Sequence, residues 1–338
     1  MFRNKTLLIT GGTGSLGKSL VIKLLTKYSE IKKVIIYSRD ELKQFEFNDY
    51  LTKLKLKKNN YRFFIGDVRD KNRVKYALKD VDYVVHAAAL KQVPAAEYNP
   101  FEFIKTNIIG AQNIIEASLE SNVQKIIALS TDKASSPINL YGATKLCSDK
   151  LFVAAQNYSG KKNIKFSVVR YGNVLGSRGS IIPILIKAKD EKYFRITHKE
   201  MTRFNITLDA AVNFVIDCLK NTRGGEIFIP KLKSYRILDI CKAMDENKPI
   251  KIIGIRSGEK LHEQMFSEFD CENIIEDKKK YIILQPKNNN IVVNYSSFEI
   301  KSKKLNKIFS YNSRDNKSFL KVKEIKNLVQ NLHNETLF

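Results

Sequence analysis

The chain has 338 residues, 43% of them hydrophobic, and its 59 basic and 35 acidic residues give a formal net charge of +24 at pH 7. This length and apolar content predict a folded protein with a large core, and no apolar run approaches the roughly 18 residues of a membrane span. The lysines are spread along the chain without a helix-turn-helix signal, so we expect solvated surfaces or an anionic small molecule to explain them, and neither nucleic acid nor membrane as a partner.

Strand-like and helix-like segments alternate from the N-terminus onward. Apolar, β-branched runs predict strands at Thr6–Thr10, Lys33–Tyr37, Tyr61–Ile65, Asp82–Ala87, Lys125–Leu129 and Phe166–Val169. Helical patterns fall between them at Ser15–Lys27, Asp40–Leu56, Asn72–Leu78, Pro100–Leu119 and Pro137–Ala155. This alternation predicts an α/β protein with a doubly wound parallel (Rossmann) sheet, which binds ligands at the carboxyl ends of its strands.

The pattern loosens after Arg170, and Gly225–Ile229 predicts one further strand of the sheet. We therefore expect a large cofactor-binding domain of residues 1–172 with about 205–230, and a smaller C-terminal substrate-binding domain from 173–204 and 231–338. The first predicted strand follows Met1 closely, without a signal-peptide pattern, which predicts a cytoplasmic protein. The four cysteines form no Cys-x-x-Cys pair, so neither a disulfide framework nor a metal site is predicted.

A glycine-rich turn, Gly11–Gly17, joins the first strand to the first helix. It fits Gly12-x-Gly14-x-x-Gly17 and also Gly11-x-x-Gly14-x-x-Gly17. In either register the backbone can approach a pyrophosphate closely, and the helix directs its free amide groups and positive dipole end at it. With a plain tight turn as the alternative, the pattern predicts a dinucleotide site that includes Gly11, Thr13, Gly14, Ser15, Leu16 and Gly17.

The end of the second strand, Ser38-Arg39-Asp40, indicates which dinucleotide binds. NAD sites place an acid on the ribose diol, whereas NADP sites need positive charge for the extra phosphate. Ser38, Arg39 and Lys43 can donate to that phosphate, so the sequence favours NADP. Two observations oppose this interpretation: Asp40 fits NAD, and Ser38-x-x-Glu41 also matches a helix capping box.

Two later strand ends add candidate cofactor residues. Asp67 and Val68 follow the third strand, where Asp67 would face the adenine amino group, although an Asx turn explains an isolated Gly-Asp as well. Ala87, Ala88 and Ala89 follow the fourth strand and leave room for a cofactor.

An acid, a base, a phenol and a second amine follow the fifth strand. Asp132 and Lys133 come just after Lys125–Leu129, so we expect them at the carboxyl edge of the sheet. Tyr141 and Lys145 are four residues apart on a predicted helix, where the ammonium can lower the pKa of the phenol. This composition is typical of an active site, with a surface ion pair of Asp132 and Lys133 as the alternative.

These motifs resemble the extended short-chain dehydrogenase/reductases and, among them, the inverting UDP-N-acetylglucosamine 4,6-dehydratases that begin pseudaminic acid synthesis. The resemblance extends from about residue 5 to about residue 290. Beyond the glycine turn it rests on Lys91–Pro94, Glu97–Pro100, Ser130–Ala134, Arg170–Val174, Gly176–Ser180, Met201–Phe204 and Gly258–Glu263. Retaining 4,6-dehydratases carry Asp-Glu where this chain has Asp132-Lys133, and sugar 4-epimerases lack the pair.

The resemblance implies a redox-neutral dehydration in which NADP is a bound catalyst. Tyr141, assisted by Lys145 and Thr131, would deprotonate the 4-hydroxyl. Lys133 would take the C5 proton, Asp132 would protonate the leaving C6 hydroxyl, and reprotonation from the opposite side would invert C5. As a base, Lys133 needs a pKa below ~10.4, which we expect burial to provide. The family positions add Lys91, Asn107, Tyr141, Lys145 and Val174 to the cofactor residues.

Substrate residues also come from the resemblance, with UDP-N-acetylglucosamine as the expected ligand and a homo-oligomer, often a hexamer, as the expected assembly. The matching positions are Lys91, Asn173, Arg178, Gly179, Thr197, Met201, Arg203, Arg256 and Glu259. Each charged side chain among them has a solvated charge as its alternative. His262 and Glu263 lack a second His at ligand spacing, so we interpret them as helix residues that brace the pocket. Ser257 and His198–Glu200 depart from the family pattern.

Three other functions remain open. A UDP-sugar 4-epimerase or C5-epimerase shares the fold and the Tyr-Lys pair, and loss of water from the product would distinguish a dehydratase from it. A dinucleotide-sensing regulatory protein would keep the glycine turn without needing Tyr141 and Lys145. Nucleic-acid binding through charge alone predicts a steep salt dependence of duplex binding.

Overall fold

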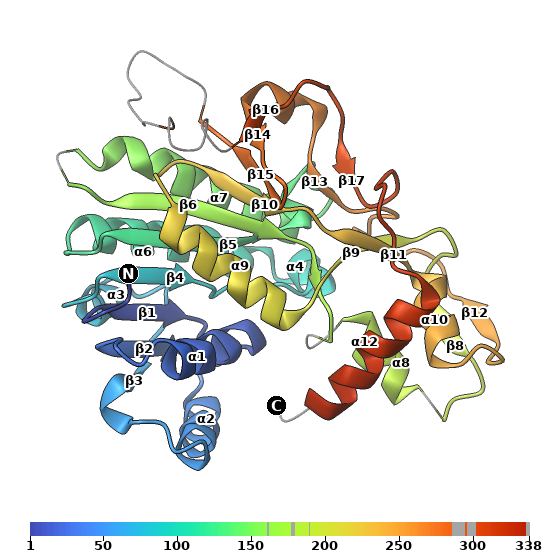
Figure 1. The fold of residues 1–338 in the computed structure, drawn as a ribbon, viewed down its shortest axis with the longest axis horizontal. Helices are drawn as coiled ribbons and strands as arrows, with labels where there is room; N and C mark the ends of the chain where they lie inside the picture. Colours follow the sequence, from blue (N-terminus) through green and yellow to red (C-terminus); the bar gives the residue numbers. More distant parts are fainter. Residues whose placement is uncertain (161, 177–179, 189, 286–294, 296–301, 336–338) are drawn as a thin grey trace.

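A ten-stranded sheet organises most of the described chain (Figure 1). The computed structural model describes residues 1–338 except 161, 177–179, 189, 286–294, 296–301 and 336–338. Within this sheet the strand order is β16-β14-β15-β10-β6-β5-β4-β1-β2-β3. The strands are β1 (Thr6–Thr10), β2 (Lys33–Ser38), β3 (Tyr61–Ile65), β4 (Tyr83–His86), β5 (Lys125–Thr131), β6 (Lys165–Tyr171), β10 (Ile227–Pro230), β14 (Ile274–Glu276), β15 (Lys280–Ile283) and β16 (Lys303–Lys304).

The run from β3 to β10 is parallel, which confirms the predicted doubly wound sheet. β10 pairs with β6, as the segment Gly225–Ile229 predicts. The antiparallel strands β15, β14 and β16 then extend the sheet, so residues assigned from sequence to the substrate-binding unit also contribute to the large sheet. Strand order reverses direction between β1 and β4, and this crevice at the carboxyl ends is where such sheets bind ligands.

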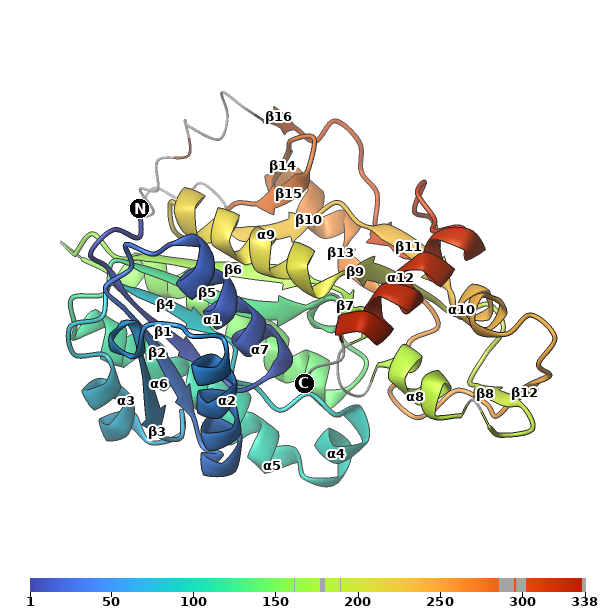
Figure 2. The same ribbon diagram turned by 60° about the horizontal axis from the view of Figure 1, so that its bottom comes forward.

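Helices cover both faces of the parallel part (Figure 2). They are α1 (Ser15–Lys27), α2 (Glu41–Lys53), α3 (Lys71–Ala77), α4 (Val93–Tyr98), α5 (Pro100–Phe103), α6 (Gly110–Leu119), α7 (Leu140–Ala155) and α9 (Leu208–Asn221), with a π-helical segment Ile104–Ile109 before α6. Leu7 and Ile9 of β1 pack in the core under α1 and α9, whereas Leu8 packs in the core under α3 and α6. Burial on both faces explains why these strands are continuous apolar runs.

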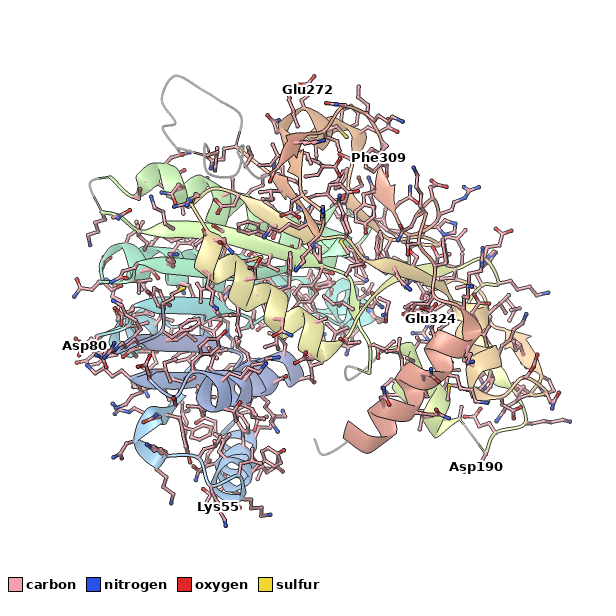
Figure 3. The ribbon with its side chains drawn as sticks, viewed as in Figure 1. Lys55, Asp80, Asp190, Glu272, Phe309 and Glu324 are labelled. Atoms are coloured by element: carbon pink, nitrogen blue, oxygen red, sulfur yellow. The ribbon has the colours of Figure 1, made fainter. Side chains whose placement is uncertain are left out.

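A second core lies beyond the large sheet, around α8 (Ile181–Lys187), α10 (Ile237–Met244) and α12 (Val322–Glu335) (Figure 1). The short strands of this region and its surroundings are β7 (Asn173–Val174), β8 (Phe194–Ile196), β9 (Thr202–Ile206), β11 (Lys233–Arg236), β12 (Ile250–Ile252), β13 (Gln264–Phe266) and β17 (Tyr311–Asn312). On its surface, Glu324 of α12 pairs with Lys233 of β11 at 2.7 Å (Figure 3). In the part of the chain that the structure describes, no helix combines the length and apolar character needed to cross a membrane.

Two helices begin later than their sequence patterns predict. The predicted helix from Pro137 begins at Leu140, because the side chain of Asn139 caps it by accepting a hydrogen bond from the Gly142 amide at 2.7 Å. The predicted helix from Asp40 begins at Glu41, and Asp40 is its cap, accepting from the Lys43 amide at 3.0 Å. The capping box suggested by Ser38-x-x-Glu41 is therefore wrong.

Behind the carboxyl end of β5, a buried ion pair joins α7 to β6. Asp149 Oδ2 lies 3.0 Å from Nη2 of Arg170 and accepts a hydrogen bond from the Ser130 hydroxyl at 2.7 Å. Arg170 also donates to the carbonyl oxygen of Met265 at 2.7 Å. The pair thus ties the helix that carries Tyr141 to two strands of different parts of the chain.

We expect Asp149→Ala to lower the free energy of unfolding by about 3–5 kcal/mol, because it leaves the Arg170 charge buried without its partner. Urea unfolding followed by circular dichroism measures this loss. Glu30→Ala is the matched control, since it removes one partner of the exposed Arg3–Glu30 pair and should change stability by less than about 1 kcal/mol. Equal effects of the two substitutions would contradict the structural role of the buried pair.

Candidate active site

A cavity of about 540 Å³ opens at the carboxyl ends of the parallel strands. Its wall includes the glycine turn, the ends of β2 and β3, the alanines after β4, and Thr131, Lys133, Tyr141 and Lys145. The site therefore lies where the sequence predicts it, at the point where strand order reverses.

The glycine turn forms a cradle that side chains would fill. Gly11 has a φ of +65°, and a Cβ added to it would lie 2.9 Å from the amide nitrogen of Ala88. A Cβ on Gly17 would lie 2.6 Å from the Gly11 carbonyl oxygen. Gly11, Gly14 and Gly17 line the cavity, whereas Gly12 packs against Ile36. The geometry thus favours the Gly11-x-x-Gly14-x-x-Gly17 register and suits the close approach of a pyrophosphate.

A buried hydrogen-bond network, absent from the sequence-based expectations, holds the turn after β4. The Thr10 hydroxyl oxygen accepts hydrogen bonds from the amides of Ala87 and Ala88, both at 3.1 Å, and lies 2.8 Å from Nδ1 of His86. Burial, helped by Lys145, lowers the pKa of His86 to about 3, so this histidine is neutral. Because the Thr10 oxygen already accepts from two amides, its own proton is directed to Nδ1 of His86, and this contact helps to fix the wall beside the glycine turn.

The far end of the cavity carries the residues predicted to select the dinucleotide. Ser38, Arg39, Lys43, Asp67 and Val68 all line it. The carboxylate of Asp40 caps α2 and forms an ion pair with Lys43, so both charges are partnered. Arg39 is half exposed, and its Nη1 lies 3.5 Å from Oδ2 of Asp67.

Asp67 also makes the Asx turn that the sequence allows, because its Oδ1 accepts from the Arg69 amide at 2.9 Å. The Arg69 side chain donates to Oδ2 from Nε at 2.9 Å and from Nη2 at 2.7 Å. Burial would raise the pKa of Asp67, but Arg69 and Arg39 lower it below its usual value. The carboxylate is thus held in a fixed, ionised position at the cavity wall.

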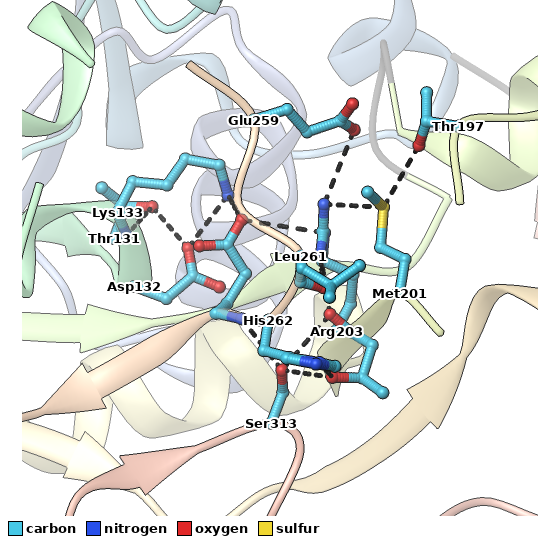
Figure 4. Close-up of polar contacts among 12 residues, drawn as sticks. Thr131, Asp132, Lys133, Thr197, Met201, Arg203, Glu259, Leu261, His262 and Ser313 are labelled. Atoms are coloured by element: carbon cyan, nitrogen blue, oxygen red, sulfur yellow. Dashed lines mark hydrogen bonds and ion pairs between the residues drawn. The ribbon is translucent and has the colours of Figure 1, made fainter. Parts of the chain in front are cut away.

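The acid–base pair follows β5 directly, as predicted, in the short helical turn η3 (Asp132–Ala134). Lys133 lines the cavity, and its Nζ lies 3.1 Å from Oδ1 of Asp132 (Figure 4). The same Oδ1 accepts from the Thr131 hydroxyl at 3.0 Å, and the Thr131 side chain also interacts with the phenol of Tyr141. These contacts form a continuous chain from Tyr141 through Thr131 and Asp132 to Lys133.

Asp132 differs from the expectation that it faces the substrate, because its side chain is fully buried and does not line the cavity. Its Oδ2 lacks a hydrogen-bond partner and lies behind Gly172, where a Cβ on that glycine would be 3.1 Å from Oδ2 and 3.2 Å from Cε of Met265. Only Oδ1 points toward the cavity-lining groups. A proton can therefore leave Asp132 for the cavity through Thr131 or Lys133, not directly.

The pKa values of this group follow from burial and charge. Burial raises the pKa of Asp132, and the nearby charge of Lys133 only partly opposes this. Burial would lower the pKa of Lys133, but the carboxylates of Asp132 and Glu263 raise it above the ordinary lysine value. The expected fall in the pKa of Lys133 is thus wrong for this arrangement, because Glu263 adds a second carboxylate beside the amine.

The Tyr141 phenol and the Lys145 ammonium also line the cavity. Burial raises the pKa of Tyr141 to about 12, while Lys133 and the side chain of Thr131 oppose the rise. Burial lowers the pKa of Lys145, although Asp149 opposes it. The groups that favour the phenolate here are thus Lys133 and Thr131, where the sequence predicted Lys145.

The predicted substrate residues lie in different places relative to the cavity. Lys91 and Asn173 line the cavity, and burial together with Lys133 lowers the pKa of Lys91. Thr197, Met201, Arg203 and Glu259 form a cluster outside the cavity wall, in which Arg203 lies 3.6 Å from the Glu259 carboxylate (Figure 4). Arg256 is exposed, and Arg178 and Gly179 lie outside the described residues.

Asn107, His262 and Glu263 lie differently from the sequence-based expectation. Asn107 does not line the cavity: its amide braces Leu90, accepting from that amide and donating to that carbonyl, both at 2.9 Å. His262 and Glu263 lie in an extended segment before β13, not in a helix. Val174, by contrast, lines the cavity as predicted. Glu263 is buried beside Lys133, with 2.9 Å between Oε1 and Nζ, and no sequence pattern indicated this contact.

Comparison with known proteins gives matches along nearly the whole chain. A family model described as polysaccharide biosynthesis protein matches residues 7–285. The chain is 51% identical over 336 residues to a protein of Campylobacter jejuni named UDP-N-acetylglucosamine 4,6-dehydratase (inverting), covering 97% of this chain and 98% of that protein. It is 40% identical over 340 residues to a protein of Rickettsia bellii named UDP-glucose 4-epimerase, covering 98% of this chain and 97% of that one. Among solved structures, Pen from Bacillus thuringiensis is 35% identical, with a TM-score of 0.88 and coverage of 98% of this chain and 99% of that one.

Proposed function

Because this chain belongs to the polysaccharide biosynthesis protein family and, within it, to the hydro-lyases called inverting UDP-N-acetylglucosamine 4,6-dehydratases, we propose that it removes water from UDP-N-acetylglucosamine and inverts C5. The products are UDP-2-acetamido-2,6-dideoxy-β-L-arabino-hex-4-ulose and water, and the reaction begins pseudaminic acid synthesis. The observation that carries this proposal is the Lys133 ammonium at the cavity wall, backed by a buried carboxyl group and close to a second base, Tyr141.

The first step is oxidation at C4. Tyr141 takes the proton of the 4-hydroxyl, favoured by Thr131 and by the positive charge of Lys133, with Lys145 as the further assisting group that the family resemblance implies. A bound dinucleotide would supply the redox chemistry, which is the uptake of hydride from C4 and its return at C6. The cradle of Gly11, Gly14 and Gly17 and the neutral, braced wall at Ala87 and Ala88 support such a dinucleotide.

The second step is loss of water. The C4 carbonyl acidifies the C5 proton, which Lys133 removes, while the C6 oxygen leaves with a proton that comes from Asp132 by way of Thr131. Tyr141 takes one proton from the 4-hydroxyl, and one proton leaves with the C6 oxygen. The chain of contacts from Tyr141 through Thr131 to Asp132 can therefore restore the acid within one turnover.

Inversion requires that C5 regain its proton on the face opposite to Lys133.

Substrate is held by Lys91 and Asn173 at the cavity and by the Arg203 cluster, with Arg178, Gly179 and Arg256 from adjoining segments. In this proposal the large sheet forms the cofactor unit and the second core forms most of the substrate unit. The active protein is a cytoplasmic homo-oligomer, a hexamer by family resemblance.

The cofactor is NADP. Asp40, the residue that would suit NAD, is committed to capping α2 and to pairing with Lys43, whereas Arg39 is half exposed at the cavity wall. Its ion pair with Asp67 is long, at 3.5 Å, so the guanidinium can turn to a 2′-phosphate.

We expect Arg39→Ala to raise the Kd for NADP by about 10- to 100-fold, the loss of one or two charge-assisted hydrogen bonds, and to change the Kd for NAD little. Calorimetric titration with both dinucleotides measures the two constants. Arg69→Ala is the control, because Arg69 holds the same Asp67 carboxylate without lining the cavity. Equal weakening of NAD and NADP by Arg39→Ala would mean that the 2′-phosphate binds elsewhere.

Mass spectrometry of UDP-N-acetylglucosamine incubated with the pure protein and NADP tests the reaction itself. A product lighter by one water, with the L configuration at C5 by NMR, is the expected result. The relative named UDP-glucose 4-epimerase favours one alternative, a 4-epimerase, which would give a product of unchanged mass.

A further inference from the structure

Glu263 is a buried carboxylate that the reaction steps above do not use. It lies just before β13, far along the chain from η3, yet its Oε1 is 2.9 Å from Nζ of Lys133. Only 2% of its side chain is exposed, compared with 1% for Asp132 and 22% for Lys133. The amine at the cavity wall is therefore held between two buried carboxyl groups.

The two carboxyl groups do not share the available positive charge equally. Glu263 faces Lys133 at 2.9 Å and also Nε of Arg203 at 3.7 Å. Among the described residues Asp132 has the Lys133 ammonium alone within ion-pair distance, and its Oδ2 lies beside Gly172. Within the described part of the chain each of the two carboxyl groups has one buried oxygen without a hydrogen-bond partner, so the facing cations decide: the negative charge belongs on Glu263, which faces two of them, and the proton belongs on Asp132. Burial raises the pKa of Asp132, whereas Lys133 and Arg203 overcome burial and lower that of Glu263, in agreement with this assignment.

This arrangement leaves Lys133 with a proton that it must lose before it can act as a base. Asp132 already carries a proton, so it cannot accept another without losing its role as the acid. The other charged or titratable groups that face this trio are Lys91 after β4, Arg203 of β9, Tyr141 of α7, Tyr235 of β11 and Lys260 of the loop before Glu263. None of these five is a carboxylate, so Glu263 is the acceptor within reach among the described residues.

We propose that Glu263 is a positioning residue that holds the Lys133 ammonium and takes up its proton, so that the free amine can attack the C5 proton. In this step the N–H bond of Lys133 breaks as an O–H bond forms at Oε1 of Glu263. The amine lone pair then forms a new N–H bond as the C5–H bond breaks, and the electron pair of that bond remains with the sugar. To restore the starting state, Lys133 at the cavity wall releases the C5 proton to solvent and regains its own proton from Glu263, while C5 takes a proton from solvent on its opposite face. The step rests on the proposed dehydration.

Glu263→Gln keeps the size of the side chain and a hydrogen bond to Lys133 but removes the proton acceptor. We expect dehydration and solvent-deuterium exchange at C5 to fall by about 10²-fold, the lower end of what general acid–base catalysis contributes. Oxidation at C4, followed by the absorbance of reduced nicotinamide, should persist, and KM should change little. Glu263→Asp restores a carboxylate and should recover part of the lost rate.

Glu259→Gln is the matched control, because Glu259 pairs with Arg203 at 3.6 Å and has no contact with Lys133 at ion-pair distance. It should raise KM without affecting C5 exchange selectively. Normal C5 exchange in Glu263→Gln would overturn the inference, as would equal loss of both half-reactions without recovery in Glu263→Asp. The mass of the wild-type product is measured in the same experiment. An unchanged mass would reject the proposed dehydration itself. If the wild type does dehydrate the substrate, the result for Glu263→Gln tests the role of Glu263 alone.

Discussion

Lys133→Met is expected to reduce dehydration of UDP-N-acetylglucosamine by about 10⁴-fold, the upper end of the contribution of a general base. Methionine nearly keeps the length and volume of lysine but has no amine to take the C5 proton. Oxidation at C4 does not need that amine, so reduced nicotinamide should accumulate after substrate is added. Solvent deuterium should not enter C5, and NMR of the recovered nucleotide sugar measures this directly.

Lys260→Met is the comparison variant for this experiment. Lys260 belongs to the same electrostatic neighbourhood and donates to the Ser135 carbonyl at 2.7 Å, but it does not line the cavity. Its removal should leave C5 exchange within the range of the wild type. If both variants lost exchange to the same degree, net positive charge near η3, and not a base at Lys133, would be responsible. Ordinary turnover by Lys133→Met would remove this residue from the mechanism.

The large sheet is predictable from sequence because its strands are buried on both faces. Each of Thr6–Thr10 is buried, and such a continuous apolar run is recognisable without knowing its neighbours. The positions of Asp132 and Lys133 follow from the same pattern, since they come directly after the run that forms β5. The local sequence pattern does not decide where α7 begins, because both Pro137 and Asn139 are plausible starts. The hydrogen bond from the Gly142 amide to the Asn139 side chain decides between them.

The environment of Lys133 depends on contacts between segments that are distant in the chain. Glu263 reaches it from beside β13, a strand of three residues that is too short to give a periodic pattern. In a chain rich in charged residues, a single glutamate such as Glu263 is expected from sequence to lie on the solvated surface. Asn107 shows the converse case, because a motif position suggested a ligand contact while the side chain satisfies the backbone of Leu90. In both cases tertiary hydrogen bonding decided the role.

Tyr141→Phe is expected to lower the rate of C4 oxidation by about 10³- to 10⁴-fold, because phenylalanine fills the same space without a group that can take the 4-hydroxyl proton. Burial raises the pKa of Tyr141 to about 12, so the phenolate fraction grows as pH rises toward that value. The wild-type rate of C4 oxidation should therefore increase with pH, whereas the residual rate of the variant should not follow this phenol. Single-turnover absorbance of reduced nicotinamide across a pH series measures both.

Tyr171→Phe provides a second phenol for comparison. Tyr171 lines the same cavity, and burial together with Tyr141 raises its pKa, but the described contacts give it no hydrogen bond to Thr131. Because it is not linked to Thr131 and Asp132, its loss should reduce C4 oxidation far less. Comparable losses in the two variants would show that the cavity needs both phenols for packing. A wild-type rate that is independent of pH would argue that another group takes the proton, and Thr131 would then be the next residue to replace.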